Sequence, residues 1–314
     1  MIVFEASYRL QIYLSLPANM EAFLVFILVL PWIYVLSLAP FPLLHVLAQL
    51  LSFLLNTVFN YRRSLVEQNI AKAFPNYTPK QIKETSKKFY LHFADLFIEI
   101  IKAVTLNNRA FKKRYTVSGF DHIEEILNQK KSVIIMAGHQ SNWEWTSALS
   151  LYTTHRFYAI YQKINNRYFD AFMRKNRART GLYLLPTYLT KKTVAEHHEK
   201  REVSLYGFLS DQSPTLKKTK LWTEFFGRYV PVHTGAEELA REFDLAVFYM
   251  DLKKVKRSHY HADFELLSEH PATLEPFVLT KMFLSKVENS VKEQPETYLW
   301  THRRFKHENA KENY

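Results

Sequence analysis

The sequence predicts an α/β protein, with a single largely parallel central sheet flanked by helices and an N-terminal membrane-anchoring helical segment. Beyond Pro75, short apolar runs alternate with longer stretches of helical periodicity, which is typical of a parallel sheet with helical crossovers. Before Pro75 the chain is almost continuously apolar. The 314 residues are enough to bury one large core. We therefore expect a membrane anchor and interfacial helix over residues 1–60, one α/β domain over 61–306 and a disordered tail over 307–314.

Residues 23–39 contain no charged side chain and are dominated by Leu, Val, Ile and aromatic residues. This length is near the lower limit for a helix that crosses a bilayer. The preceding residues carry acidic as well as basic side chains, unlike a secretory signal with its basic region and small-residue cleavage site, so we expect the anchor to stay attached. Pro31 would kink this helix, and Pro40 with Pro42 would end it.

The next apolar run, residues 41–59, carries polar side chains at spacings that place them in one stripe of a helix. These are His45, Gln49, Ser52 and Asn56. A free-standing membrane span gains nothing from such a stripe, so we expect this helix to pack on protein or to lie in the membrane interface, with His45 in a packing role. Basic residues at 62, 63 and 72 favour the cytoplasmic side for the domain that follows.

The elements beyond Pro75 follow from periodicity. Helices are predicted over 79–104, 144–152, 166–180, 189–199, 234–243 and 276–291, and strands over 133–137, 157–161, 203–209, 246–251 and 260–266. Ligands of open α/β sheets bind beyond the carboxyl ends of the strands. Three predicted strands end there in polar groups, at Gly138-His139, at Tyr161-Gln-Lys163 and at Ser210-Asp-Gln212. We expect these three ends to meet at one site.

Composition restricts the partners of the chain. A formal charge of +12 favours anionic partners: phospholipid headgroups, phosphorylated sugars, an acidic carrier protein or nucleic acid. No recognised nucleic-acid module is visible and the N-terminus is apolar, so we expect a membrane surface and no nucleic acid. The absence of Cys excludes disulfides, thiolate zinc sites and a Cys nucleophile. Histidines at 155, 197, 198, 259 and 261 have no further ligand at a persuasive spacing, so we expect no metal.

A candidate catalytic base follows the apolar run over 133–137, where His139 precedes Glu144 by five residues. A His can take a proton from a hydroxyl near neutral pH, and a carboxylate on its other ring nitrogen fixes the tautomer. Residues five apart do not face each other on a helix. The pair can converge if His139 lies in the turn after the strand and Glu144 in the first helical turn. Gly138 would supply the tight turn, and Ser141 or Asn142 would cap the helix.

Basic residues concentrate between residues 161 and 201, with ten Lys or Arg against three acids. Arg174, Arg177 and Arg179 fall near the end of a predicted helix, where cations also offset the helix dipole, so a solvated helix face remains one interpretation. The other is a phosphate clamp, because guanidinium groups bind phosphate bidentately.

The block Gly138-His-Gln-Ser-Asn-Trp-Glu144 resembles the His-x4-Asp/Glu motif of the lysophospholipid acyltransferase superfamily, in particular of the late (lauroyl/myristoyl) acyltransferases of lipid A biosynthesis. Further blocks agree in order and spacing, so that the resemblance covers residues 23 to 306. They are Tyr61-Arg-Arg63, Asn69-Ile-Ala-Lys-Ala-Phe-Pro75, Tyr161-Gln-Lys163, the run Arg174 to Gly181, Ser210-Asp-Gln-Ser213, Phe225-Phe-Gly227 and Tyr298-Leu-Trp-Thr-His-Arg-Arg-Phe305. Gln140 and Ser141 depart from the Phe-Gly often found there. The Glu-Gly-Thr-Arg block of glycerolipid acyltransferases is absent, which disfavours lysophosphatidic acid as the acceptor.

The resemblance implies an O-acyltransferase that uses a thioester of acyl carrier protein or coenzyme A, with no other cofactor. It implies a lipid A precursor as the membrane lipid acceptor, at the cytoplasmic face of a Gram-negative inner membrane. His139 would be the general base, oriented by Glu144. The substrate-binding residues would be Asn142, Gln162, Lys163, Arg177, Arg179, Asp211 and Gln212. For Asp211, a turn or cap residue is the alternative. Alternative functions are O-acylation of an aminolipid or another lysolipid, a non-catalytic lipid-binding protein of the same fold, and a lipid hydrolase.

Overall fold

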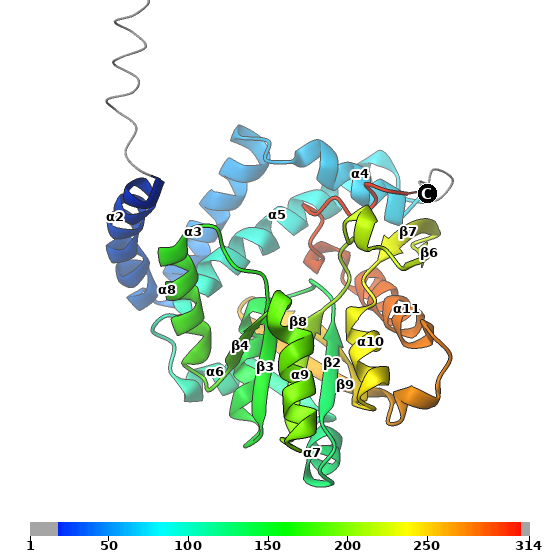
Figure 1. Cartoon of the computed structure of the whole chain (residues 1–314). Coiled ribbons are helices and arrows are strands. Elements are labelled where there is room, and N and C mark those ends of the chain that lie inside the picture. The colour runs from blue at the N-terminus through cyan, green and yellow to red at the C-terminus, as the bar shows by residue number, and fades with distance from the viewer. Residues whose placement is uncertain (1–17, 309–314) are drawn as a thin grey trace, which may run out of the picture.

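The computed structural model of the chain describes residues 18–308 and contains a seven-stranded sheet in the order β1-β9-β8-β2-β5-β3-β4 (Figure 1). The five strands from β8 to β4 are mutually parallel, while β9 runs antiparallel to β8 and β1 is parallel to β9. The strands are β1 Tyr115–Ser118, β2 Val133–Ala137, β3 Arg156–Tyr161, β4 Tyr183–Pro186, β5 Ser204–Leu209, β8 Ala246–Lys256 and β9 His259–Ser268. A separate antiparallel ribbon joins β6 Leu221–Phe225 and β7 Arg228–Val232. The predicted fold class is confirmed.

Helices cover both faces of the sheet, so β2 is buried at all five positions. Side chains of β2 alternate between two cores: Ile134 and Met136 enter the core formed with α5, α10 and α11, whereas Val133 and Ile135 enter the core formed with α6 and α7. In Figure 1, α9 and α10 lie in front of the sheet and α5 crosses above it. The helices beyond residue 60 are α4 Arg63–Ala73, α5 Pro79–Lys102, α6 Asn108–Arg114, α7 Phe120–Asn128, α8 Arg167–Ala178, α9 Thr190–Glu199, α10 Gly235–Glu242 and α11 Val278–Glu293.

The predicted elements are all present, with one change of type. The helix expected over 144–152 is a 3₁₀ helix, Trp143–Leu151. The prediction missed the four-residue strands β1 and β4, the ribbon β6–β7, and the short helices α4, α6 and α7.

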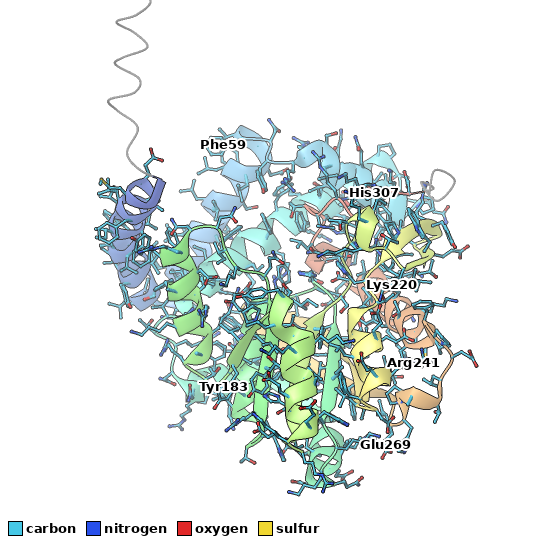
Figure 2. All side chains as sticks on the ribbon, viewed as in Figure 1. Phe59, Tyr183, Lys220, Arg241, Glu269 and His307 are labelled. Carbon is cyan, nitrogen blue, oxygen red and sulfur yellow. The ribbon has the colours of Figure 1, made fainter. Side chains whose placement is uncertain are left out.

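The N-terminal helices are α2 Ala18–Leu38 and α3 Phe41–Phe53, and a π-helical turn, Leu54–Val58, extends α3. Pro40 separates them as predicted. Both are long and apolar enough to cross a membrane, and only 6% and 11% of their apolar windows are buried against protein. In α3, His45 has the packing role predicted for it, because its Nε2 lies 2.9 Å from Ser258 Oγ. Figure 2 shows Phe59 projecting where this apolar segment ends.

Helix α2 is held against the domain by aromatic packing on α8 and by hydrogen bonds to its backbone. Phe26 packs against Phe169 and Phe172 of α8, with ring centroids 5.3 and 6.3 Å away, and Lys102 of α5 donates to the carbonyl of Ser37 at 2.9 Å. Of the tail expected over 307–314, residues 309–314 lie outside the described part of the chain. Glu308 forms an ion pair with Lys72 at 2.5 Å.

Candidate active site

The loop after β2 is held by the C-terminal segment of the chain. The amide of Leu299 donates to the carbonyl of His139 at 3.0 Å, and the amide of Ser141 donates to the carbonyl of Thr297 at 2.9 Å. These bonds form an isolated antiparallel bridge between Gln140 and Tyr298 and fix the backbone immediately after His139. The imidazole is therefore positioned by segments that are about 160 residues apart in the chain.

Two features of this loop differ from the prediction. The left-handed residue of the turn is Ser141, with φ of +53°, and Gly138 does not have a positive φ. Gly138 instead lies close to α11, because a Cβ there would lie 3.3 Å from Val287 Cγ1, a tight contact. The cap prediction is confirmed for Asn142, whose Oδ1 accepts from the amide of Trp145 at 3.0 Å.

The imidazole of His139 is bonded to a carboxylate from the end of β5. Its Nδ1 lies 2.6 Å from Asp211 Oδ1, and its backbone amide donates to Asp211 Oδ2 at 3.1 Å. Burial alone would raise the pKa of Asp211, but the charge and hydrogen bonds of His139 and the hydroxyl of Tyr298 lower it to about 2. An ionised Asp211 accepts the Nδ1 proton, which leaves Nε2 of a neutral His139 as the basic nitrogen.

The predicted pairing of His139 with Glu144 is wrong. The carboxylate of Glu144 is bound by Arg177 of α8, at 2.7 and 2.9 Å from Nη2 and 3.0 Å from Nε. Both side chains are about one-fifth exposed. The reason lies in the strand order, because β5 lies next to β2 and brings Asp211 to the imidazole from a position that local spacing cannot reveal. Trp143 packs its ring edge-on to His139, with centroids 5.5 Å apart.

A buried hydrogen-bond network also holds the Asp211 carboxylate. Its carboxylate accepts a hydrogen bond from Tyr298, which is bonded in turn to the Arg304 guanidinium. Arg304 is 1% exposed and also donates to Ser213 Oγ at 3.0 Å. Burial raises the pKa of Tyr298 well above its usual range, so the phenol stays a donor. The block from Tyr298 to Phe305 was singled out by the resemblance, but nothing local assigned these two side chains to Asp211.

A cavity of about 680 Å³ opens at this edge of the sheet, within the range typical of ligand sites. His139, Gln162 and Gln212 all line it, so the predicted meeting of three strand ends is confirmed. Its apolar wall is formed by side chains from β3, β4 and β5 and from the residue before β4. These are Ile160, Leu182, Leu184, Phe208 and Leu209. The site therefore places an imidazole base in a cavity with one apolar wall.

The other predicted substrate-binding residues lie partly in the cavity and partly outside it. Arg177 lines the cavity, but Glu144 neutralises it. Lys163 is exposed and lies over the ring of Tyr188 at 5.4 Å.

Two of the predicted substrate-binding residues are already used within the fold. Asn142 is fully buried and donates to Glu99 Oε2 at 2.6 Å, so its amide faces away from the cavity. Arg179 donates to the carbonyls of Ala103 and Val104, just beyond the end of α5. Such bonds satisfy backbone acceptors beyond a helix end and leave no clamp for a phosphate.

Sequence reasoning also missed a buried carboxyl behind the loop. Glu99 of α5 is 1% exposed and accepts hydrogen bonds from Asn142, from Ser258 Oγ at 2.8 Å and from the Tyr260 hydroxyl at 2.7 Å. Burial raises the pKa of Glu99 to about 7, although these bonds oppose the shift. Its partners come from distant segments, so the sequence carries no local signal of the cluster.

Comparison with known proteins gives two matches. The model of a family described as bacterial lipid A biosynthesis acyltransferase matches residues 15–307. A protein of Haemophilus influenzae named lipid A biosynthesis acyltransferase is 22% identical over 275 residues, which cover 86% of this chain and 83% of that protein.

Proposed function

This chain belongs to the bacterial lipid A biosynthesis acyltransferase family, and from that premise we propose that it moves a fatty acyl group from a thioester donor to a hydroxyl of a lipid A precursor at a membrane. The family establishes acyl transfer in lipid A biosynthesis. The identity of the donor, that of the acceptor hydroxyl and the catalytic role of individual residues are what we propose here. The single observation that carries it is the 2.6 Å contact between His139 and Asp211, where His139 lines a cavity that has an apolar wall.

The reaction begins with proton transfer from the acceptor hydroxyl to Nε2 of His139. Asp211 holds the Nδ1 proton and stabilises the imidazolium that forms. The acceptor oxygen attacks the thioester carbonyl, a C–O bond forms, and collapse of the tetrahedral intermediate breaks the C–S bond. The thiolate then takes the proton from His139. No acyl-enzyme is required, and the sequence contains no Gly-x-Ser-x-Gly elbow.

Glu144 has a positioning role in this scheme. Its bidentate bond to Arg177 ties the start of the 3₁₀ helix to α8 and shapes the cavity wall beside Trp143. The charge of Arg177 is compensated by the same bond, which leaves its guanidinium little capacity for a substrate phosphate.

The donor is an acyl carrier protein or coenzyme A thioester, whose acyl chain would enter the apolar part of the cavity. The acceptor is supplied from a membrane on which α2 and α3 rest, since both expose apolar side chains along most of their length. Basic residues that follow α3, among them Arg62 and Arg63, favour the cytoplasmic face of the inner membrane and an anionic lipid surface.

The test is mass spectrometry of membrane lipids from cells that lack the gene, complemented at matched protein levels with the wild-type chain, His139→Ala or His270→Ala. His270 is a surface histidine with a 63% exposed side chain and serves as the control. We expect lipid A to lose one acyl chain in the deletion strain, and wild type and His270→Ala to restore it. Restoration by His139→Ala would contradict the mechanism, and loss of an acyl chain from another lipid class would contradict the acceptor.

A further inference from the structure

The charged side chains that line the cavity are mostly compensated. Arg177 is bound by Glu144, and Lys191 lies 2.7 Å from Glu242. Glu238, the third lining carboxylate, lies 2.6 Å from Lys220, which is labelled in Figure 2.

Lys218 is the exception. It lines the cavity, its side chain is exposed, and within residues 18–308 no carboxylate lies within ion-pair distance of its ammonium group. Among the lining Lys and Arg side chains of that range, it alone is uncompensated. A lone cation at the mouth of a ligand cavity lacks the anion that would balance it.

His233 supplies a second donor beside this cation. It lies between the end of β7 and the start of α10 and lines the same cavity. Its ring has no hydrogen-bond partner within the described part of the chain. Leu221 at the start of β6 is paired with Val232 at the end of β7, so His233 follows the strand end that lies beside the segment carrying Lys218. His233 and Lys218 therefore lie near the same end of the β6–β7 ribbon and line the same cavity.

We propose that Lys218 and His233 form a phosphate-binding subsite at the mouth of the cavity. An ammonium group and an imidazole N–H from two different loops are donors suited to phosphate oxygens. The proposal rests on the function proposed above, in which both substrates carry phosphate: the donor in its pantetheine arm and the acceptor on its sugar. The subsite takes the place of the clamp that the sequence predicted at Arg177 and Arg179, whose guanidinium groups are already bonded within the fold.

The test compares Lys218→Gln with Lys217→Gln in the purified full-length protein. Lys217 is the adjacent exposed lysine and does not line the cavity, so it controls for net charge. We would measure kcat and KM with an acyl-coenzyme A donor and with an S-acyl-N-acetylcysteamine donor that has no phosphate, each against a phosphorylated and a dephosphorylated acceptor. The KM for the substrate whose phosphate is bound should rise about 10- to 100-fold in Lys218→Gln, as expected for loss of a charged hydrogen bond. Its kcat should change far less.

Removing the bound phosphate from its substrate should abolish the difference in KM between Lys218→Gln and wild type. The substrate for which this happens, donor or acceptor, is the one whose phosphate the subsite binds. His233→Gln should raise the same KM by a smaller factor. Equal KM values for Lys218→Gln and Lys217→Gln with every substrate would overturn the proposal while leaving the proposed function intact. If wild type shows no turnover, direct binding of 4′-phosphopantetheine and of glucosamine 1-phosphate tests whether the subsite binds phosphate. Wild type and Lys217→Gln should bind one of them more tightly than Lys218→Gln, and binding that the three proteins share equally would contradict the subsite.

Discussion

Nδ1 of His139 lies 2.6 Å from Oδ1 of Asp211, although the two residues are 72 positions apart in the chain. The contact follows from strand register. Ala137 at the end of β2 is paired with Leu209 at the end of β5, and each functional residue lies two positions beyond its strand. The amide of Ser210 continues the pairing by donating to the carbonyl of Ala137 at 3.1 Å. A base and its orienting acid are thus brought together by two adjacent parallel strands, of which β2 is buried at every position.

Asp211→Asn should lower kcat by about 10³- to 10⁴-fold, as expected when the residue that fixes a catalytic tautomer loses its charge. The Asn amide can donate to Nδ1 and so stabilise the tautomer whose Nε2 is protonated and no longer basic. Steady-state kinetics would measure this effect, with Asp263→Asn as a control at an exposed aspartate of β9. Retention of more than a tenth of wild-type kcat would contradict the assigned role.

Glu144 and Arg177 should behave as a coupled structural pair. In a double-mutant cycle with Glu144→Gln and Arg177→Gln, the free energy of unfolding should show a coupling of about 1 kcal/mol, a modest value because both side chains are partly exposed. Each single variant should lose less activity than Asp211→Asn. The contrary outcome is a Glu144→Gln variant as inactive as Asp211→Asn beside a fully active Arg177→Gln. It would restore Glu144 as the acid that orients His139.

Glu99 should make stability depend on pH. Its pKa is raised by burial from 4.5 to about 7 in the folded protein, so the folded state binds the proton more tightly than the unfolded state does. The stabilisation is fully present below pH 4.5 and is lost as the pH rises through 7. It amounts to about 3 kcal/mol at most.

The test is the free energy of unfolding in detergent between pH 5 and 8, for wild type and for Glu99→Gln. Gln resembles the protonated acid, since its carbonyl can accept from Asn142 and Tyr260 while its amide donates to Ser258. Wild type should lose stability relative to Glu99→Gln over this range. Parallel curves for the two proteins would mean that Glu99 does not change protonation there.

The positions of the main strands and the polar ends of three of them could be predicted from the sequence. Apolar runs such as that of β2 have a clear length and clear limits, and parallel topology then directs their carboxyl ends to one edge. For this reason His139, Gln162 and Gln212 are all found at the cavity. The partners of these side chains could not be predicted, because each depends on which strand or helix is the neighbour in space.

Two of the site assignments and one residue that was missed show the limit. Glu144 is near His139 in sequence, yet α8 places Arg177 beside Glu144, and the Glu144 carboxylate pairs with that guanidinium. Arg179 belongs to the strongest basic run of the chain, yet it satisfies backbone carbonyls beyond the end of α5. Glu99 lies in a helix that was predicted correctly, but its donors come from 43 to 161 residues away.

Helix α2 should be the element whose apolar surface attaches the protein to membranes. Leu28 is 69% exposed although it lies in the middle of an apolar helix, a placement that is unfavourable in water and favourable in a bilayer. A charged side chain at such a position opposes insertion by about 2.5 to 3.5 kcal/mol. Leu28→Arg should therefore shift protein from the membrane fraction to the soluble fraction in a flotation assay with anionic vesicles.

Met282→Arg is the matched control, since Met282 is an exposed apolar residue, 37% accessible, on α11 at the opposite side of the molecule from α2 (Figure 1). Equal flotation of the two variants would show that α2 does not carry the attachment and would direct attention to α3.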